Sequence, residues 1–377
     1  MRIGAVLWLL CCVLLVLAGC APRVSPPAVY HAVAWQDLPG WQEDDLVPAL
    51  SAFRRSCEVL QTRESWTEPC REAQALPKES TTIRRFFERR FVPWQLQQED
   101  GSGDGLITGY YVPDIDARRT PSAQYRYPIY GRPDDLLVID LSSVYPELGR
   151  YRLRGRIEGQ RVVPYWQRSE IDGNCSPLKG DELFWVKDPV ELFFLQVQGS
   201  GRVNLPDGER VMVNYADQNG HPYRSIGQLL LERHVMTRDQ MSMQNIAAWA
   251  RLHPQEVQAL LNENPSYVFF RPLELASDTP PGALGVPLTA ERSLAVDPRY
   301  VPLGTPVYLA TQRPDSEQSL QRLMVAQDTG GAIKGRVRAD FFWGVGDQAG
   351  SYAGRMKHNG QLWLLLPQGV APEQNGK

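Results

Sequence analysis

The chain has 377 residues, which is long enough for two domains with their own hydrophobic cores. Apolar residues make up 43% and charged residues 22%, and these fractions are typical of a folded globular protein and argue against a largely disordered chain. The net charge of −3 leaves no excess of Lys and Arg for binding a phosphate backbone, so we expect no nucleic-acid partner.

The N-terminus has the pattern of a secretory signal. One basic residue precedes a continuous apolar run over residues 3–19, which is short of the roughly 20 residues of a comfortable membrane span. The run ends in "LAGC", which resembles the lipobox whose cysteine, here Cys20, is lipidated. An uncleaved anchor helix is the alternative, but a proline-rich segment follows rather than a basic flank. We predict a lipoprotein signal peptide over 1–20 and a tether over 21–40.

The residue after the lipidation site indicates the destination. Ala21 stands where lipoproteins of the bacterial inner membrane usually carry an aspartate. We therefore predict an outer-membrane lipoprotein of a Gram-negative bacterium, facing the periplasm and anchored through the lipid on Cys20.

The remaining cysteines and the histidines bear on disulfides and metals. Cys57 and Cys70 lie in neighbouring segments with helical patterns, and the sequence leaves open a periplasmic disulfide or two buried thiols. The 5 histidines are scattered without the spacing of metal ligands. We expect no metal site and no cofactor.

Hydrophobic patterning divides the chain into helical and strand-rich parts. Apolar residues follow helical spacing over 45–60 and again over 81–91. After Gly101, short apolar runs separated by glycine and proline predict strands and hairpins, including the whole of 192–215 with a turn at "PDG". A helical region over 225–264 follows, with a proline suited to a helix's first turn, and strands return after it.

Two aspartates near the C-terminus have the surroundings of catalytic groups. Asp328 follows the apolar run "LMVAQ" and precedes a glycine pair that lets backbone approach a ligand. Asp340 precedes the aromatic run "FFW", and partial desolvation there raises a carboxyl pKa toward that of a general acid. Cleavage of a glycosidic bond needs such a proton donor. The structural alternative is that the two residues only cap a turn and a strand end.

Longer motifs connect these residues to a known family. Segments 293–309, 326–335 and 338–349 resemble the three-aspartate domain, which is named for residues matching Asp297, Asp328 and Asp340. The upstream motifs are similar to the membrane-bound lytic murein transglycosylase A family, and they are "TGYYVP" (108–113), "FFLQVQGSGRV" (193–203) and "YADQNGHPYRSIG" (215–227). With the lipobox, the resemblance extends over nearly the whole chain.

The resemblance implies a mainly β fold. It predicts a double-psi β-barrel catalytic domain that both chain ends form, 41–112 with N-terminal helices and 273–377. A second β-rich, glycan-binding domain over 113–272 is inserted between them.

The resemblance also implies a reaction. Asp340 is expected to protonate the oxygen between N-acetylmuramic acid and N-acetylglucosamine, and then to deprotonate the muramic C6 hydroxyl, which closes a 1,6-anhydro ring. Asp328 is expected to support the site, and Asp297 to hold barrel loops and to belong to the substrate-binding residues. Peptidoglycan strands are the expected partner, and complexes of cell-wall synthesis or division are left open.

Five further residues are candidates for binding glycan hydroxyls and acetamides, with ordinary turn and strand-surface roles as the alternative. They are Thr108, Tyr110, Gln198, Ser200 and Lys334. Two other functions remain open, because the same barrel fold serves several activities. One is a glycan hydrolase, and the other is a non-catalytic, expansin-like lipoprotein that binds peptidoglycan.

Overall fold

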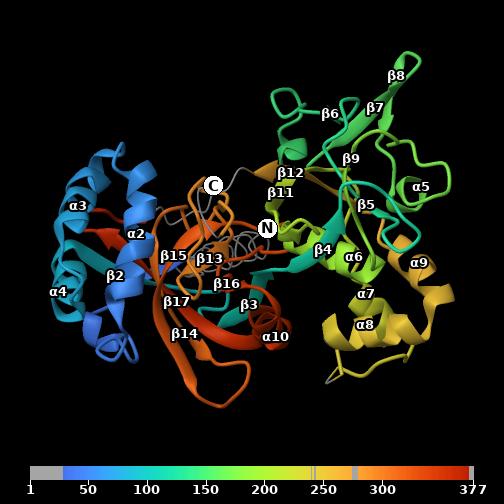
Figure 1. Ribbon diagram of the computed structural model, residues 1–377. Coiled ribbons are helices and arrows are strands. Elements are labelled where there is room, and N and C mark those ends of the chain that lie inside the picture. The colour runs from blue at the N-terminus through green and yellow to red at the C-terminus, as the bar shows by residue number, and fades with distance from the viewer. Residues whose placement is uncertain (1–28, 239, 242, 274–278, 373–377) are drawn as a thin grey trace, which may run out of the picture.

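The computed structural model describes residues 29–238, 240–241, 243–273 and 279–372, and two sheet-based units lie next to each other in it (Figure 1). The predicted signal peptide and the lipidation site Cys20 lie outside the described residues. None of the described helices has the length and apolar content that a membrane crossing requires.

The first unit is built on an eight-stranded sheet in the order β1-β2-β17-β14-β15-β13-β16-β3. An additional pairing joins β17 to β3, so the hydrogen-bonded pairs run through six strands and return to the first. The strands are β1 (Tyr30–Ala32), β2 (Phe91–Leu96), β3 (Gly105–Val112), β13 (Ser293–Val296), β14 (Pro306–Gln312), β15 (Ser319–Asp328), β16 (Arg338–Val345) and β17 (Lys357–Pro367). Both ends of the chain therefore contribute strands to one closed sheet.

The described fold begins inside the range predicted as tether. β1 pairs antiparallel with β2, and the hydroxyl of Tyr30 donates a hydrogen bond of 2.7 Å to the carbonyl of Tyr300. A short 3-10 helix, η1 (Trp35–Asp37), follows. The residues from 29 to 40 are thus part of the first unit, because buried Tyr30 and the strand pairing hold them against the sheet.

Three helices cover one side of this sheet, at the left of Figure 1, and they are α2 (Leu46–Leu60), α3 (Glu64–Ala75) and α4 (Ser80–Arg90). Asp45 caps α2, since its carboxylate accepts a hydrogen bond from the Val47 amide. The apolar faces meet around Phe53, whose ring centroid lies 5.7 Å from Phe87 and 5.9 Å from Phe91. The helical spacing of the sequence therefore marks faces that are buried together.

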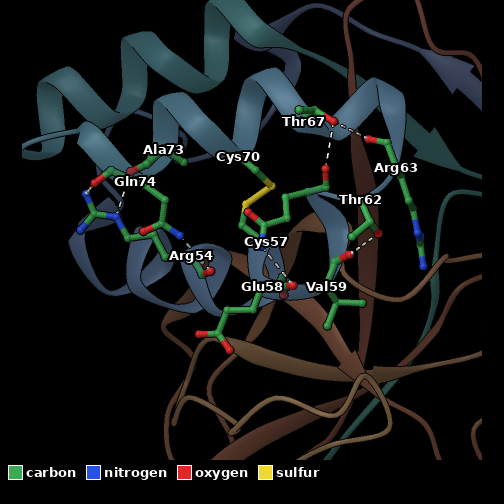
Figure 2. Close-up of a disulfide and its surroundings, with 12 residues drawn as sticks. Arg54, Cys57, Glu58, Val59, Thr62, Arg63, Thr67, Cys70, Ala73 and Gln74 are labelled. Carbon is green, nitrogen blue, oxygen red and sulfur yellow. Dashed lines mark hydrogen bonds between the residues drawn. A yellow bond between two sulfur atoms is a disulfide. The ribbon is translucent and has the colours of Figure 1, made fainter.

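A disulfide joins the first two of these helices. Cys57 of α2 and Cys70 of α3 are bonded, with their Cα atoms 5.3 Å apart (Figure 2). Of the two alternatives that the sequence leaves open, the disulfide is confirmed. Among the described residues, Cys175 is the free cysteine, and it is exposed.

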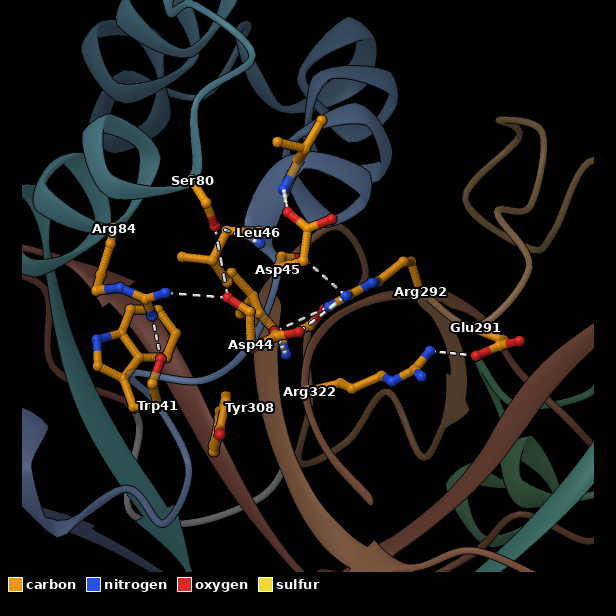
Figure 3. A network of polar contacts seen from close by, with 12 residues as sticks. Trp41, Asp44, Asp45, Leu46, Ser80, Arg84, Glu291, Arg292, Tyr308 and Arg322 are labelled. Atoms are coloured by element: carbon orange, nitrogen blue, oxygen red, sulfur yellow. Dashed lines mark hydrogen bonds and ion pairs between the residues drawn. The ribbon is translucent and has the colours of Figure 1, made fainter. Parts of the chain in front are cut away.

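A buried ion pair joins the segment before α2 to the closed sheet. The guanidinium of Arg292 donates two hydrogen bonds, of 2.8 and 2.9 Å, to the carboxylate of Asp44 (Figure 3). Asp44 also accepts the Leu323 amide at 2.7 Å, and Arg292 also donates to the Leu323 carbonyl at 2.9 Å. The charged groups satisfy each other while fixing chain segments that are far apart in sequence.

The second unit holds a six-stranded sheet in the order β12-β11-β10-β4-β9-β5 and a three-stranded sheet in the order β6-β7-β8. Its strands are β4 (Asp114–Arg118), β5 (Tyr127–Tyr130), β6 (Leu137–Val138), β7 (Arg154–Glu158), β8 (Arg161–Pro164), β9 (Glu182–Val186), β10 (Ser200–Asn204), β11 (Arg210–Gln218) and β12 (Val268–Leu273). The mainly β class is confirmed, since the chain has more strand than helix. The double-psi path of the closed sheet and the domain boundaries stay predictions.

The described helices of this unit are η2 (Pro146–Arg150), α5 (Arg168–Ile171), α6 (Pro189–Gln198), α7 (Ile226–Glu232), α8 (Met243–Leu252) and α9 (Pro254–Asn262). Of these, α6 packs against strands of the larger sheet and against α8 and α9. The predicted helical region over 225–264 corresponds to α7, α8 and α9, and Pro254 lies in the first turn of α9. Gly208 has φ 88° at the turn between β10 and β11, as the "PDG" turn requires.

The strand prediction was wrong for residues 192–198, which lie in α6. Asp188 caps this helix through the Val190 amide, Pro189 occupies its first turn, and Gly199 ends it at φ 77°. Most of its residues are apolar, so no periodicity distinguishes a buried helix from a buried strand here. The residues that begin and end the helix, Asp188, Pro189 and Gly199, are the sequence features that distinguish a helix from a strand here.

Candidate active site

The two central aspartates lie on strands that flank β13. Ala295 of β13 is in register with Asp328 of β15 on one side and with Asp340 of β16 on the other. Neighbouring strands are about 4.8 Å apart, so the Cα atoms of the two aspartates are roughly 10 Å apart. The sheet thus brings together two carboxylates on either side of a small, buried alanine.

Asp340 is held by a short chain of hydrogen bonds. The Thr108 hydroxyl donates to Asp340 Oδ1 at 2.6 Å, and Arg338 Nη2 donates to the Thr108 oxygen at 2.9 Å. Thr108 and Asp340 are register partners in the parallel pairing of β3 with β16. Burial raises the pKa of Asp340 to about 6, with a contribution from the Asp328 charge, although the Thr108 hydrogen bond and Arg338 oppose the rise.

Asp328 is fixed by backbone amides. Its Oδ1 accepts hydrogen bonds from the amides of Ala283 and Thr329, each at 2.9 Å. Burial raises its pKa, and these hydrogen bonds oppose the rise. Both carboxylates therefore bind protons more tightly than an exposed aspartate does.

Tyr110 lies near both carboxylates and belongs to an apolar cluster that the two units share. Its pKa is raised well above the ordinary value by burial and by the charges of Asp328 and Asp340. Its ring centroid is 5.1 Å from that of Phe342, and both rings belong to a cluster that includes Met212 of the second unit. Tyr110 therefore borders the site and helps to hold the units together.

Asp297, the third of the aspartates, has hydrogen-bond partners that differ from those of Asp328 and Asp340. Its carboxylate accepts the Arg299 guanidinium and, at 2.9 Å, the amide of Gly335. Burial acts to raise its pKa, but the Arg299 and Gly335 hydrogen bonds hold the pKa below the usual range. The Gly335 contact ties the loop between β15 and β16 to Asp297, and the role of Asp297 stays a prediction.

The other predicted glycan-binding residues do not contact the two carboxylates. Gln198 accepts a hydrogen bond of 3.2 Å from the Tyr111 amide and so joins α6 to β3. Ser200 is buried at the start of β10, and Lys334 is exposed on the loop before β16. Of the five candidates, Thr108 and Tyr110 are the ones that the structure brings to Asp340 and Asp328.

Arg338 is a site residue that the sequence prediction missed. It lies two positions before Asp340 on β16, and alternate residues of a strand point to the same face. Burial lowers the pKa of Arg338, while the Asp340 charge acts to raise it. Two features of the sequence could have identified Arg338, namely its position two residues before Asp340 on a predicted strand and its positive charge.

Among the residues that the structure describes, no group of three or more His, Cys, Asp or Glu side chains is placed to hold a metal ion.

Two family models match the chain. One, described as the MltA specific insert domain, matches residues 106–271, and the other, described as the 3D domain, matches residues 292–366. Together they include the three aspartates, Thr108, Tyr110 and Arg338, but not Ala283, whose amide holds Asp328.

Characterised relatives match most of the chain. It is 35% identical to the membrane-bound lytic murein transglycosylase A of Escherichia coli strain K12 over 279 residues, which are 72% of this chain and 68% of the relative. The protein of the same name from Vibrio cholerae is 32% identical, again over 72% of this chain and 68% of the relative.

Solved structures extend the similarity to nearly the full length. MltA of Neisseria gonorrhoeae is 40% identical, with a TM-score of 0.81 over 94% of this chain and 99% of that one. The E. coli MltA structure with bound chitohexaose is 30% identical, with a TM-score of 0.70 over 94% and 98% of the two chains. The lytic transglycosylase LtgG of Burkholderia pseudomallei is 45% identical, with a TM-score of 0.64 over 92% and 99%.

Proposed function

The chain belongs to the membrane-bound lytic murein transglycosylase A family, and on that premise we propose that Asp340 is the acid and base of its reaction. The protein is a lytic murein transglycosylase, which cleaves the β-1,4 bond from N-acetylmuramic acid to N-acetylglucosamine and leaves a 1,6-anhydro ring. The remaining question is how its own residues carry out these steps.

One observation carries the assignment of Asp340. Its pKa of about 6 leaves roughly a tenth of the carboxyl protonated at pH 7, far more than an ordinary aspartate retains, and an acid catalyst requires the protonated form. Thr108 occupies Oδ1, and Oδ2 accepts no hydrogen bond from any described residue. The free oxygen supports a role in which Asp340 faces the glycosidic oxygen of a bound strand.

The reaction then needs no second carboxylate as nucleophile. Asp340 gives its proton to the oxygen that leaves with N-acetylglucosamine, and the bond from this oxygen to the muramic C1 breaks. The Asp340 carboxylate next takes the proton of the muramic C6 hydroxyl, whose oxygen bonds to C1. Atoms balance without water, and the tethered hydroxyl is worth an effective molarity on the order of 10⁵ M or more.

Asp328 is proposed to support the positive charge that develops at C1. Two backbone amides hold its carboxylate in place through Oδ1. Its Cα atom lies roughly 10 Å from that of Asp340, on the other side of β13. Its charge also raises the pKa of Asp340, which keeps the acid protonated. Arg338 and Thr108 act in the opposite direction, so these neighbours together set the pKa.

The site of action is proposed to be the periplasmic face of the outer membrane. The relatives are named membrane-bound, and the predicted lipid on Cys20 supplies an anchor for this chain. Glycan binding is supported by the chitohexaose bound to the E. coli relative, and we propose that the second unit takes part in it.

Product analysis tests the reaction that these residues are proposed to carry out. Murein sacculi are digested with the purified mature chain, and the released muropeptides are weighed by mass spectrometry. Muropeptides with anhydro ends, lighter by one water than those with reducing ends, are the expected product. Reducing ends alone would assign a hydrolase, and no release with retained glycan would assign a binding lipoprotein.

A further inference from the structure

A cavity of about 540 Å³ lies beside the loop that precedes β16. One wall is the turn between β2 and β3, which contributes Glu99, Asp100 and Asp104, and the other holds Tyr300 and Arg336. None of these residues belongs to the candidate active site. A cation and three carboxylates thus face one polar space.

Arg336 has unused hydrogen-bond donors. Its side chain is 18% exposed, and its Nε and Nη1 atoms are buried without a hydrogen-bond partner among the described residues. Its Nη2 lies 4.0 Å from Glu99, beyond hydrogen-bond distance, and the Glu99 side chain is 89% exposed. Buried donors without partners cost free energy, and because Nε and Nη1 are closed to solvent, an anion in the cavity meets the Arg336 guanidinium through Nη2.

The carboxylates on the opposite wall are held in place by local contacts. Asp100 Oδ1 accepts the Ser102 amide at 2.9 Å, and Asp104 Oδ1 accepts the Gln361 side chain at 2.9 Å. Each carboxylate keeps a second oxygen that is free to accept. The cavity therefore offers Arg336 as a donor to a carboxylate, and Asp100 and Asp104 as acceptors for an ammonium group.

The cavity lies within reach of a strand at Asp340. Arg336 precedes Asp340 by four positions, and because Arg336 and Val337 form a turn before β16, the separation along the chain is at most about 13 Å. The first residues of a peptide attached to the muramic sugar span about 10 Å for three residues in extended form. Gly335, next to Arg336, is held by the carboxylate of Asp297, so the loop is fixed relative to the sheet.

We propose that this cavity binds the peptide stem of the murein strand being cleaved, through a diamino acid whose far end carries a free carboxylate and a free ammonium group. Arg336 receives the carboxylate, and Asp100 and Asp104 receive the ammonium group. The inference rests on the proposed function, since the stem reaches the cavity only when the muramic sugar lies at Asp340.

Cleavage of two substrates tests the proposal. Sacculi with intact stems are compared with glycan strands from which an amidase has removed the stems, and kcat/KM is measured for anhydro-end release. Arg336→Gln is expected to lower kcat/KM about tenfold on stem-bearing murein and to leave stem-free strands within about twofold of the wild type. Arg71→Gln, on the exposed surface of α3, is the matched control and should change neither value.

The outcomes separate the two proposals. Equal loss on both substrates, or no loss on either, would overturn the stem site. Absence of anhydro ends from the wild type on both substrates would instead overturn the proposed function.

Direct binding decides the inference independently of turnover. The probe is a synthetic tripeptide that ends in a diamino acid with free amino and carboxyl groups, titrated into the full mature chain by calorimetry. Acetylation of that amine, amidation of that carboxylate, Arg336→Gln and Asp100→Asn should each weaken binding about tenfold. Binding that is unchanged by all four, or no binding by the wild type, would overturn the proposal.

Discussion

Thr108 and Asp340 are 232 residues apart in sequence and are joined by a hydrogen bond of 2.6 Å across the parallel pairing of β3 and β16. The bond occupies one oxygen of the carboxylate and leaves the other available. It also links Asp340 to Arg338, whose guanidinium donates to the Thr108 oxygen at 2.9 Å. The pKa of the proposed acid is therefore set by residues from both ends of the first unit.

Replacement of Asp340 is expected to remove turnover. Asp340→Asn keeps the size of the side chain and its acceptor for Thr108 but has no proton to exchange, so anhydro-end release should fall by about 10³ to 10⁴-fold or more. Binding of glycan strands should persist. Asp328→Asn should reduce release less severely; if it alone abolished release, the acid would have to be assigned to Asp328.

The stability of the Asp340→Asn variant shows whether it folds and tests the raised pKa of Asp340. The pKa of Asp340 is raised from 3.8 to about 6 on folding, so its charged form costs stability above pH 6, and the cost is absent below pH 3.8. Asp340→Asn should therefore unfold at a higher temperature than the wild type at pH 7.5, with a smaller difference at pH 4. A lower unfolding temperature at pH 7.5 would contradict the raised pKa.

The pH dependence of the rate should shift in opposite directions in two variants. The wild-type rate should fall as the pH rises through about 6, because Asp340 loses the proton that it must donate. Thr108→Val removes a hydrogen bond that favours the carboxylate, so the fall should move to higher pH. Asp328→Asn removes a negative charge that disfavours the ionised form of Asp340, so the fall in rate should move to lower pH. Profiles of kcat/KM for the three proteins check this, and parallel shifts would refute the assignment.

The buried ion pair of Asp44 and Arg292 is expected to matter for stability. Asp44→Asn leaves the Arg292 charge buried without its partner, and this should lower the free energy of unfolding by about 3 to 5 kcal/mol. Denaturant titration gives the measurement. Glu43→Gln, at the exposed neighbouring position, is the control and should differ little from the wild type.

The disulfide between α2 and α3 is expected to stabilise the first unit. Removing the bond by Cys57→Ser with Cys70→Ser should cost about 3 kcal/mol, because the unfolded chain regains the freedom of a loop with a sequence separation of 13. The unfolding temperatures of the wild type and the double variant are compared. Cys175→Ser removes the exposed free cysteine and should leave the unfolding temperature unchanged.

The lipid anchor is tested in cells. Cys20→Ala should yield an unlipidated or unprocessed precursor, since the lipobox lacks its acceptor thiol. Radiolabelled palmitate and membrane fractionation report the outcome, and Cys12→Ala, inside the signal peptide, is the matched control that should still be labelled. Label that persists at the N-terminus of Cys20→Ala would reject the prediction.

The sequence by itself determined the features that depend on short stretches of chain. The spacing of apolar residues marks α2 and α4, Pro254 marks the first turn of α9, and Gly208 marks the turn between β10 and β11. The aromatic neighbours of Asp340 indicate a carboxyl acid, and the longer motifs indicate the family. These signals are local, since caps, turns and periodicity act over a few residues.

The tertiary structure alone decided which groups surround that acid. Pairing of β3 with β16 brings Thr108 to Asp340, and β13 sets Asp328 and Asp340 on its two sides. The choice between a disulfide and two thiols at Cys57 was likewise settled in three dimensions. Strand order and register between distant segments depend on which faces are buried together, and a shift of one residue would turn each side chain to the opposite face of the sheet.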